Sequence, residues 1–331
     1  MVYMPSTTPL PAATGSDVAA LAHAVRTHPG WTAKSAIGLV SEVLGPSDWE
    51  RGPGDDGAVV PTAHGRIVAC GEAMWPPFVE RDPRAAGFAA VLTNVNDVAA
   101  MGGRPLGLVD TVVAAEPAAR AILEGLRRGC ELFGIPLLGG HLTPHDGTPS
   151  VSAFAVGDLG GEPLSVTRCA PGQDLVVAAA LDGRMRPDFP FFPAFEQRGT
   201  RCAGDVAVLA TLADSGAAVA AKDISMAGLA GSLAMLLEWG PFGVEVDLDA
   251  VPCPEGVDLA AWLTCFPSFG FLLCAAPGRT AEVLGAFHER GLAAAAVGRL
   301  DDSGVLAFRR DGARAQVADL RTEPVTRLSR A

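Results

Sequence analysis

Five carboxylates stand where the sequence predicts the ends of strands and helices, and together they could hold a metal ion. Asp55 and Asp56 lie in the glycine-rich stretch GPGDDGAVV, which leads into a predicted strand. Glu72 follows the apolar run IVACG, Asp97 lies inside the helical stretch TNVNDVAAMGG, and Asp223 lies at the start of KDISMAGLAGSL. Carboxylate oxygens are the protein ligands that Mg²⁺ prefers, and Mg²⁺ commonly serves sites that handle phosphates. The group therefore suggests a magnesium site.

Taken singly, these carboxylates have ordinary structural explanations. Asp97 could be solvated or act in capping, because an acidic side chain beside an apolar helix face is costly unless it is hydrated or paired. Asp223 is expected to be a helix N-cap, since aspartate accepts hydrogen bonds from the first helical amides. Glu72 is expected at the surface, at the end of a strand. The residues alone leave the structural and the metal-binding explanations open.

The composition is that of an acidic globular protein. The 331 residues carry a formal net charge of −12 without a cluster of Lys or Arg, which argues against a nucleic-acid partner. The seven cysteines form no CxxC pair, so we expect buried, reduced thiols and a cytoplasmic protein. No apolar run is long enough to span a membrane, and the N-terminus lacks the pattern of a secretory signal.

Three other patterns carry weaker signals. HLTPH, residues 141–145, has the i, i+4 histidine spacing of zinc sites, but Pro144 disfavours the helix that this spacing needs. The run PDFPFFPAF, residues 187–195, is expected to be a packed loop, with a flap over a ligand as the alternative. A Walker sequence is absent and no GxGxxG motif follows a predicted strand, so neither a P-loop nor a Rossmann site is expected.

Two successive α/β halves are predicted to position these side chains. Strands and helices alternate twice, with a break near residues 162–170, and gaps of hairpin length predict mixed rather than purely parallel sheets. We predict a mobile arm over residues 1–15, a first domain over 16–165 and a second over 166–331. The predicted strands cover residues 65–75, 105–115, 135–144, 150–160, 171–181, 243–248, 268–277 and 292–300, and the predicted helices cover residues 16–28, 82–103, 117–134, 202–216, 223–240 and 279–291.

The order and spacing of six motifs resemble those of the aminoimidazole-ribonucleotide-synthetase-like superfamily. The motifs are GDDGAVV, GEAMWPPFV, NVNDVAAMGGRPL, LLGGH, VTRCAPGQD and DISMAGLAGSL, and the resemblance runs from residue 34 to residue 300. The superfamily includes thiamine-monophosphate kinase, selenophosphate synthetase, the hydrogenase-maturation carbamoyl dehydratase and the formylglycinamidine synthetases. This chain looks most like a synthetase-related branch.

The resemblance implies a two-domain α/β fold with mixed sheets. Its N-terminal domain would bind ATP and Mg²⁺ and would form a barrel with the sheet of a second copy, giving a homodimer with a cleft at the interface. The shared reaction step is the attack of an oxygen of a small metabolite on the γ-phosphate of ATP. In the kinase this oxygen belongs to a phosphate, and in the synthetases it belongs to an amide. A partner protein that supplies an amide donor is also implied as possible.

The resemblance assigns roles to individual residues. It implies that the metal ligands are Asp56, Glu72, Asp97 and Asp223. It implies that nucleotide-binding residues are Lys34, Asp55, Asn94, Gly139, Gly140 and Arg168. Asp223 would bind a metal or orient the acceptor, and with His141 it makes up the predicted catalytic set.

Two positions depart from the family's pattern. His141 replaces the aspartate of the family's GGDT, and Met226 replaces the second aspartate of its DISDGL. A thioether is too soft to bind Mg²⁺ well, so fewer metal ions are expected, whereas a protonated His141 could hold a phosphate directly. The sequence therefore predicts an ATP- and Mg²⁺-dependent phosphotransferase or synthetase, with a catalytically degraded nucleotide-binding subunit as the alternative.

The adjacent aspartates are predicted to have different roles. Successive side chains of a strand point to opposite faces, so only one of the pair can face a shared site. The resemblance selects Asp56 for the metal, and Asp55 is then expected to hydrogen-bond the loop backbone or to reach the site through water.

Overall fold

The computed structural model describes residues 17–187 and 189–331, which form two compact units. The smaller unit comprises residues 56–163 and 199–214, and the larger unit comprises the other described residues. The chain passes between the units four times, so neither unit is a continuous stretch. One passage lies two residues before the predicted domain boundary at 165. The predicted arm over residues 1–15 lies outside the described residues.

Two segments group with a unit that their place in the sequence does not suggest. Residues 17–55 belong to the larger unit, where α1 (Val18–Arg26) packs against β13, β14 and α10. Residues 199–214, which include most of α8 (Cys202–Ser215), belong to the smaller unit, where Arg104 forms an ion pair with Asp214. Long-range packing, rather than order along the chain, decides this grouping.

A five-stranded sheet in the order β1-β2-β5-β3-β4 forms the smaller unit. Neighbouring strands are antiparallel except β3 and β4, which are parallel and are connected by α6. The elements of this unit are β1 (Ala58–Thr62), β2 (Gly65–Ala73), α4 (Pro76–Arg81), α5 (Pro83–Ala100), β3 (Arg104–Ala114), α6 (Glu116–Phe133), β4 (Leu137–Pro144), β5 (Ser150–Leu159), η3 (Gly199–Arg201) and α8.

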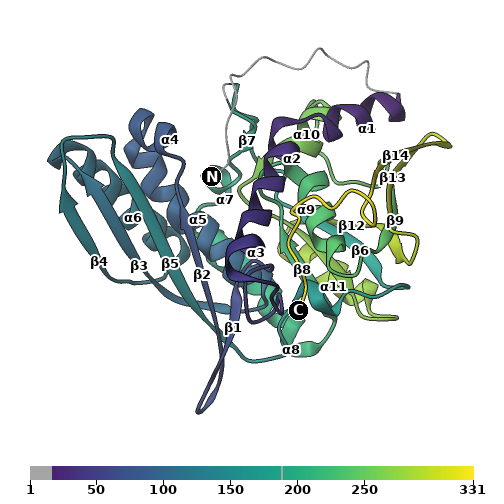
Figure 1. The fold of residues 1–331 in the computed structure, drawn as a ribbon, viewed down its shortest axis with the longest axis horizontal. Coiled ribbons are helices and arrows are strands. Elements are labelled where there is room, and N and C mark those ends of the chain that lie inside the picture. The colour runs from purple at the N-terminus through teal and green to yellow at the C-terminus, as the bar shows by residue number, and fades with distance from the viewer. Residues whose placement is uncertain (1–16, 188) are drawn as a thin grey trace. The chain divides into compact units, whose positions relative to one another are not determined.

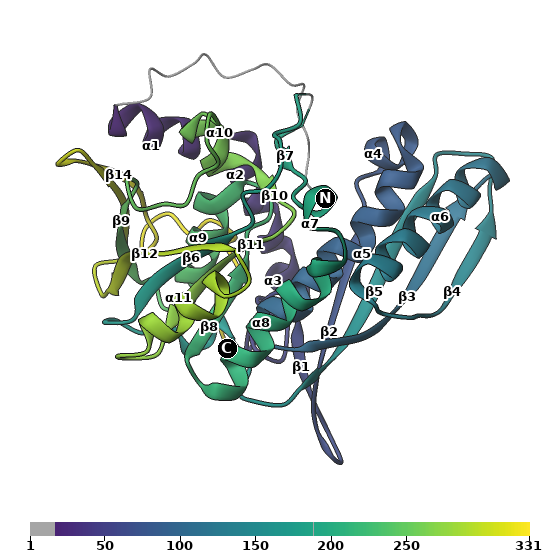
Figure 2. The same cartoon turned by 180° about the vertical axis from the view of Figure 1, so that it is seen from behind.

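Helices α5 and α6 cover one face of this sheet and leave the other face open (Figures 1 and 2). Burial alternates along β5, and Val151, Ala153 and Ala155 face the helices. On the open face, Val109 of β3 lies opposite Phe154 of β5, and these residues are 42% and 46% exposed. The sheet thus has one packed face and one face with exposed apolar side chains.

Glycines let the two covering helices approach closely. A Cβ at Gly87 of α5 would collide with the carbonyl oxygen of Ile122, and a Cβ at Gly125 of α6 would collide with that of Arg84. Because backbone lies against backbone here, no larger residue fits without moving a helix.

A seven-stranded mixed sheet in the order β14-β13-β9-β12-β6-β11-β8 forms the larger unit. Of its neighbouring strands only β9 and β13 are parallel. The elements of this unit are α1, α2 (Pro29–Ala33), η1 (Lys34–Gly38), α3 (Leu39–Leu44), η2 (Val166–Arg168), β6 (Asp174–Ala179), β7 (Phe191–Phe192), α7 (Phe195–Arg198), β8 (Ala218–Asp223), α9 (Gly228–Glu238), β9 (Gly243–Asp247), α10 (Leu259–Thr264), β10 (Phe266–Pro267), β11 (Gly270–Ala275), α11 (Thr280–His288), β12 (Ala293–Asp301), β13 (Val305–Arg310) and β14 (Ala313–Asp319).

The described part of the aromatic run over residues 187–195 packs against the larger unit, as expected, but it contains the short strand β7 and the start of α7 and is not a loop throughout. Phe192 is fully buried and meets Trp262 edge to face with ring centroids 5.3 Å apart. Phe191 packs against Phe266, and the short strands β7 and β10 pair in parallel. These contacts hold the run in the core of the larger unit.

The hairpin of β13 and β14 was not predicted, although its turn carries a recognisable signal. The turn residues are Asp311 and Gly312, which both have positive φ, at 49° and 78°. An Asp-Gly pair between two strand-forming runs is the usual signature of a two-residue hairpin. None of the helices in the described ranges combines the length and apolar character needed to cross a bilayer.

Candidate functional site

The smaller unit brings two of the predicted metal ligands together. A carboxylate oxygen of Asp56 lies within 4.8 Å of a carboxylate oxygen of Asp97. Asp56 lies just before β1, and Asp97 lies near the end of α5. Gly57, the residue after Asp56, packs closely here: a Cβ at Gly57 would lie 2.7 Å from the Val68 side chain and 3.4 Å from that of Met101. Met101 lies one helical turn beyond Asp97, so the small glycine allows Asp56 to approach the end of α5.

The thiol of Cys70 shows that negative charge converges on this region. Burial raises the pKa of the Cys70 thiol, and the charges of Asp97, Glu72 and Asp56 raise it further. Glu72 lies two residues after Cys70 on β2, so both side chains face the covered side of the sheet, opposite Ala153 and Ala155. The charges of three carboxylates therefore act on one neutral thiol.

This set of donors fits Mg²⁺. Its charged atoms are all carboxylate oxygens, and the one nearby sulfur is held in the neutral form, which binds metals poorly. A divalent cation would also offset the mutual repulsion of the carboxylates. Asp56 and Asp97 are accordingly the residues of this unit that could hold the ion, and Glu72 adds negative charge nearby.

Asn94, a predicted nucleotide contact, is fully buried and attaches α5 to the sheet. Its side-chain amide donates to the carbonyl oxygens of Ala90 at 2.8 Å and Ala153 at 3.2 Å. Its Oδ1 lies 3.4 Å from the sulfur of Cys70. These contacts hold the turn of helix that carries Asp97.

Asp55 belongs to the larger unit, and its carboxylate is used there. Its Oδ2 accepts a hydrogen bond from the Ser165 hydroxyl at 2.7 Å and another from the Val166 backbone N–H at 2.9 Å. The Asp55 carboxylate therefore accepts a hydrogen bond from a backbone N–H, as predicted. The backbone belongs to a turn 111 residues further along the chain, however, and not to the loop of Asp55 itself.

Arg168, the predicted nucleotide-binding arginine, follows this turn directly. It ends η2, whose N-cap is Ser165. The buried Gln173 braces the next loop, because its amide donates to the Arg168 carbonyl at 3.1 Å and its Oε1 accepts from the Ala170 N–H at 2.9 Å. Asp55 and Gln173 together fix the backbone on both sides of Arg168.

The prediction that Asp223 caps a helix is wrong. Asp223 is the buried last residue of β8, opposite Phe271 of β11, and its Oδ1 lies 3.8 Å from Lys222 Nζ. Helix α9 begins only at Gly228, where φ is 70° and a Cβ would collide with Leu263. The local sequence resembles a capping pattern, but pairing with a strand distant in sequence decides the conformation.

The predicted catalytic His141 lies on β4, opposite Thr111 of β3. Strand alternation places both on the open face, whereas Asp97 belongs to the helix layer on the covered face, so the smaller unit does not bring His141 to its acidic pair. Gly139 and Gly140 precede His141 in the same exposed strand. The zinc alternative gains no support, since His141 belongs to no group of three or more metal-ligating side chains among the described residues.

Lys34, another predicted nucleotide contact, lies in the larger unit. It begins η1, and its side chain is buried. The described ranges thus divide the predicted nucleotide contacts between the two units, with Lys34, Asp55 and Arg168 in the larger one.

Asp110 is a buried carboxylate that the sequence analysis did not single out. It lies on the covered face of β3, opposite Gly140 of β4, and its carboxylate fills the space that a Cβ of Gly140 would need. Burial raises the pKa of Asp110. An acidic residue in the middle of the apolar run LGLVDTVV was the available signal.

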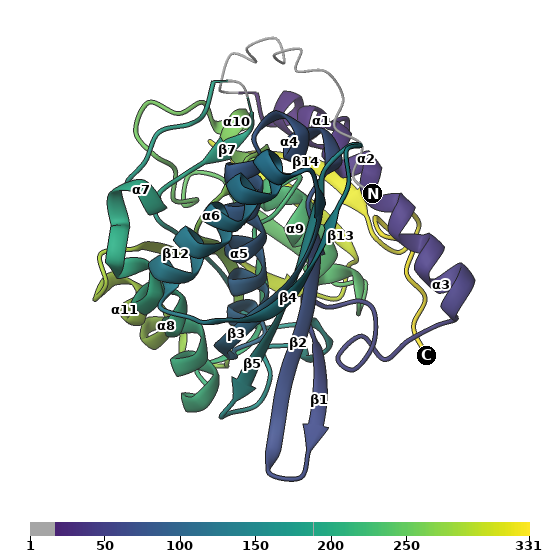
Figure 3. The same cartoon turned by 90° about the vertical axis from the view of Figure 1, so that its left-hand side faces the viewer.

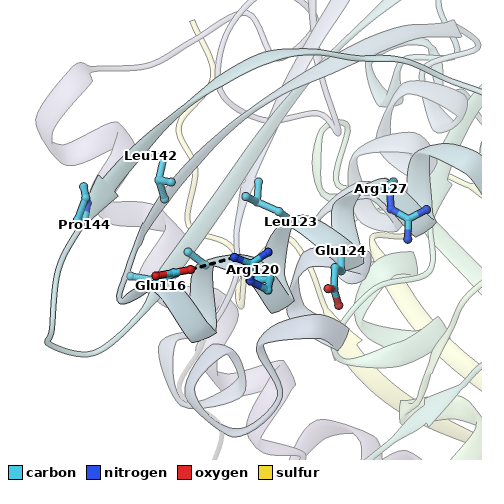
Figure 4. A pocket seen from close by; sticks show the side chains of 9 residues that line it. Glu116, Arg120, Leu123, Glu124, Arg127, Leu142 and Pro144 are labelled. Carbon is cyan, nitrogen blue, oxygen red and sulfur yellow. Dashed lines mark hydrogen bonds and ion pairs between the residues drawn. The ribbon is translucent and has the colours of Figure 1, made fainter.

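A pocket of about 480 Å³ lies elsewhere in the smaller unit, between α6 and β4 (Figure 4). Leu123 and Leu142 line it together with charged residues of α6, among which Glu116 and Arg120 form an ion pair at 2.9 Å. None of the predicted site residues lines this pocket, so it is distinct from the acidic group.

Comparison with known proteins assigns both halves of the chain to one family. The N-terminal domain of AIR synthase related proteins matches residues 54–159, and the C-terminal domain of the same proteins matches residues 197–311. The uncharacterized protein sll0787 of Synechocystis sp. PCC 6803 is 34% identical over 278 residues, which cover 82% of this chain and 85% of that protein.

Solved structures share the fold. T. maritima PurL complexed with ATP superimposes with a TM-score of 0.69 at 18% identity, over 83% of this chain and 46% of that chain. AaThiL complexed with AMPPCP and TMP superimposes with a TM-score of 0.65 at 19% identity, over 85% of this chain and 93% of that chain. This chain thus spans about half of the PurL chains that it matches, and most of AaThiL. By its two matched domains and its mixed α/β fold, the chain belongs to the AIR synthase-related family.

Proposed function

We propose that the protein uses ATP and Mg²⁺ to transfer a phosphoryl group to an oxygen of a small metabolite, as a kinase or as a synthetase. The observation that carries this proposal is the convergence of Asp56, Asp97 and the charge of Glu72 on one side of the sheet. Membership of the AIR synthase-related family supports the use of ATP, because one solved relative holds ATP and another holds its analogue AMPPCP.

The chemistry requires positioning and neutralisation of charge. An acceptor oxygen forms a bond to the γ-phosphorus while the bond to the bridging oxygen breaks, and ADP leaves with the electron pair. Bound Mg²⁺ would supply positive charge to the phosphates. Asp56, Glu72 and Asp97 would hold that charge in place, and such a reaction asks little covalent chemistry of the protein.

Residues of the larger unit would complete the nucleotide and acceptor contacts. Arg168 lies in a turn that Asp55 and Gln173 brace, and its guanidinium would make charge-assisted hydrogen bonds to a phosphate. Lys34 is proposed as a further phosphate contact. We also propose that Asp223, at the end of β8, binds a metal ion or orients the acceptor.

We further propose a homodimer that buries the open sheet face of the smaller unit. The exposed Val109 and Phe154 on that face support this arrangement. His141 lies on the same face, which favours a role at a cleft between two copies over a role beside the acidic pair of its own chain. A partner that supplies an amide donor stays a prediction.

The test is an ADP-release assay with a panel of phosphate- and amide-bearing metabolites, with and without Mg²⁺. Asp56→Asn and Asp97→Asn should each lower turnover by about 100-fold, since each removes a charge that positions the metal. Asp55→Asn, which makes the same change at the adjacent aspartate, is the variant for comparison. It should cost less turnover than Asp56→Asn, because asparagine can still accept the Val166 hydrogen bond.

Two results would oppose the proposal. Full turnover in Asp97→Asn would exclude that residue as a metal ligand. Binding of ATP without turnover on any metabolite would instead support the catalytically degraded, nucleotide-binding subunit.

A further inference from the structure

A buried carboxylate at the end of α9 anchors the 325–331 segment of the larger unit. Glu238 is 7% exposed, and its Oε1 accepts hydrogen bonds from the backbone N–H groups of Thr326 at 3.0 Å and Arg327 at 3.3 Å. Val325 and Thr326 are themselves buried. Hydrogen bonds to a buried charged group are among the stronger ones in proteins, so the 325–331 segment is firmly held where it begins.

Beyond this anchor the 325–331 segment bridges to the stretch that follows α3, and Figure 3 shows the C-terminus near that stretch. The Ser329 N–H donates to the Ser41 hydroxyl at 2.9 Å, and the Ala331 N–H donates to the Ser47 carbonyl at 3.0 Å. The Ser329 carbonyl accepts from the Ser47 N–H at 3.3 Å and from the Trp49 indole N–H at 3.4 Å.

Trp49 supports the acidic loop. Its ring is 1% exposed and lies 5.6 Å from that of Trp239, over which the Arg330 guanidinium sits at 5.7 Å. Gly54 lies against the Trp49 indole so closely that a Cβ at Gly54 would collide with it. Asp55 follows Gly54 directly, so the indole sets the path of the backbone into the two aspartates.

We infer that the 325–331 segment is a positioning element for the acidic loop. Its contacts run from Glu238 through Ser329 to Trp49 and Gly54, and they determine how the backbone enters Asp55. The consequence for turnover rests on the proposed function, in which Asp56, the next residue, holds Mg²⁺. Loss of the segment should therefore weaken metal binding without removing a ligand.

Deletion of residues 329–331 tests this inference. The deletion removes the Ser329 and Arg330 contacts but keeps those between Glu238 and Thr326, so the larger unit should still fold. We expect amide hydrogen exchange over residues 47–55 to speed up about tenfold or more. The Mg²⁺ concentration that gives half-maximal ADP release should rise about tenfold, because loss of the residues that support a metal ligand typically weakens metal binding by this amount. The kcat at saturating Mg²⁺ should change less.

Glu323→Gln is the matched control, because it removes an exposed carboxylate just before the segment. It should behave as the wild type in both measurements. Unchanged exchange over residues 47–55 in the deletion variant would overturn the inference, and so would faster exchange with an unchanged Mg²⁺ requirement.

A failure of the proposed function is distinguishable from a failure of this inference. If the wild type neither binds Mg²⁺ with ATP in titration calorimetry nor releases ADP, the proposed function fails. Hydrogen exchange over residues 47–55 then decides alone whether the segment orders the loop.

Discussion

Buried carboxylates take different roles in this chain because their surroundings differ. Asp97 lies beside a second carboxylate, Asp56, which favours a bound cation. Glu238 instead accepts hydrogen bonds from backbone N–H groups. Asp110 is buried on β3, and burial is the main cause of the rise of its pKa. At the scale of the residue, neighbours decide which carboxylate binds an ion and which is structural.

Replacing Asp110 should change how stability depends on pH. Its pKa is raised on folding, so the folded state binds the proton more tightly than the unfolded state. The stability gained from protonated Asp110 is complete below the ordinary pKa of 3.8 and is lost as pH rises through the raised value. Each tenfold difference in proton affinity is worth about 1.4 kcal/mol. Asp110→Asn should therefore lose less free energy of unfolding than the wild type as pH rises.

Urea unfolding at a series of pH values measures this effect. Asp158→Asn, which removes an exposed carboxylate from β5, is the control. If the free energy of unfolding depends on pH in the same way for both variants, the pKa of Asp110 does not differ between the folded and unfolded states, and the prediction is wrong.

At the scale of elements, the contact between α5 and α6 depends on two glycines, which have no side chain to hold the helices apart. Gly87 and Gly125 let the helix backbones touch, and both helices then lie flat on the sheet that carries Cys70 and Glu72. The position of Asp97 at the end of α5 follows from this packing. A residue far from the acidic group therefore contributes to its geometry.

Gly125→Ala should destabilise the protein by about 2 kcal/mol, because overpacking forces the helices apart. Gly285→Ala in α11 is the matched control, since a Cβ there meets nothing within 4 Å. Alanine is the better helix former, so this control should be neutral or more stable by up to about 1 kcal/mol. Denaturant unfolding compares the two variants, and equal free energies of unfolding would contradict the packing argument.

At the scale of the whole molecule, the open face of the smaller unit's sheet bears on assembly. Phe154 lies over Gly71 and beside Val109, forming a flat apolar surface. Exposed apolar surface of this kind is usually covered by another protein. A second copy of the chain is the proposed cover.

Phe154→Asp should convert a homodimer into a monomer, because two copies would bring buried like charges together. Light scattering coupled to size-exclusion chromatography measures the mass. Val43→Asp is the control, since Val43 is an exposed apolar residue on α3, outside this sheet. A wild type that is monomeric at micromolar concentration, or a dimer that survives Phe154→Asp, would contradict the proposed interface.

Much of the architecture could be predicted from local patterns in the sequence. Helices α5 and α6 appear as Ala-rich or amphipathic stretches with Pro and Gly at their ends, and β5 appears as an alternating run. The motifs around Asp56 and Asp97 pointed to the AIR synthase-related family, which the domain matches confirm. These signals are local, so they can be read from the sequence without knowledge of the fold.

Only the tertiary structure decided what each acidic residue touches. It hydrogen-bonded the Asp55 carboxylate to a turn 111 residues further along the chain, put Asp223 at the end of a strand and buried Asp110. It also put His141 on the open face. Each result depends on strand pairing or burial between segments far apart in sequence, and short-range periodicity carries no information about such contacts. The sequence determined which carboxylates could do chemistry, and long-range pairing determined which of them meet.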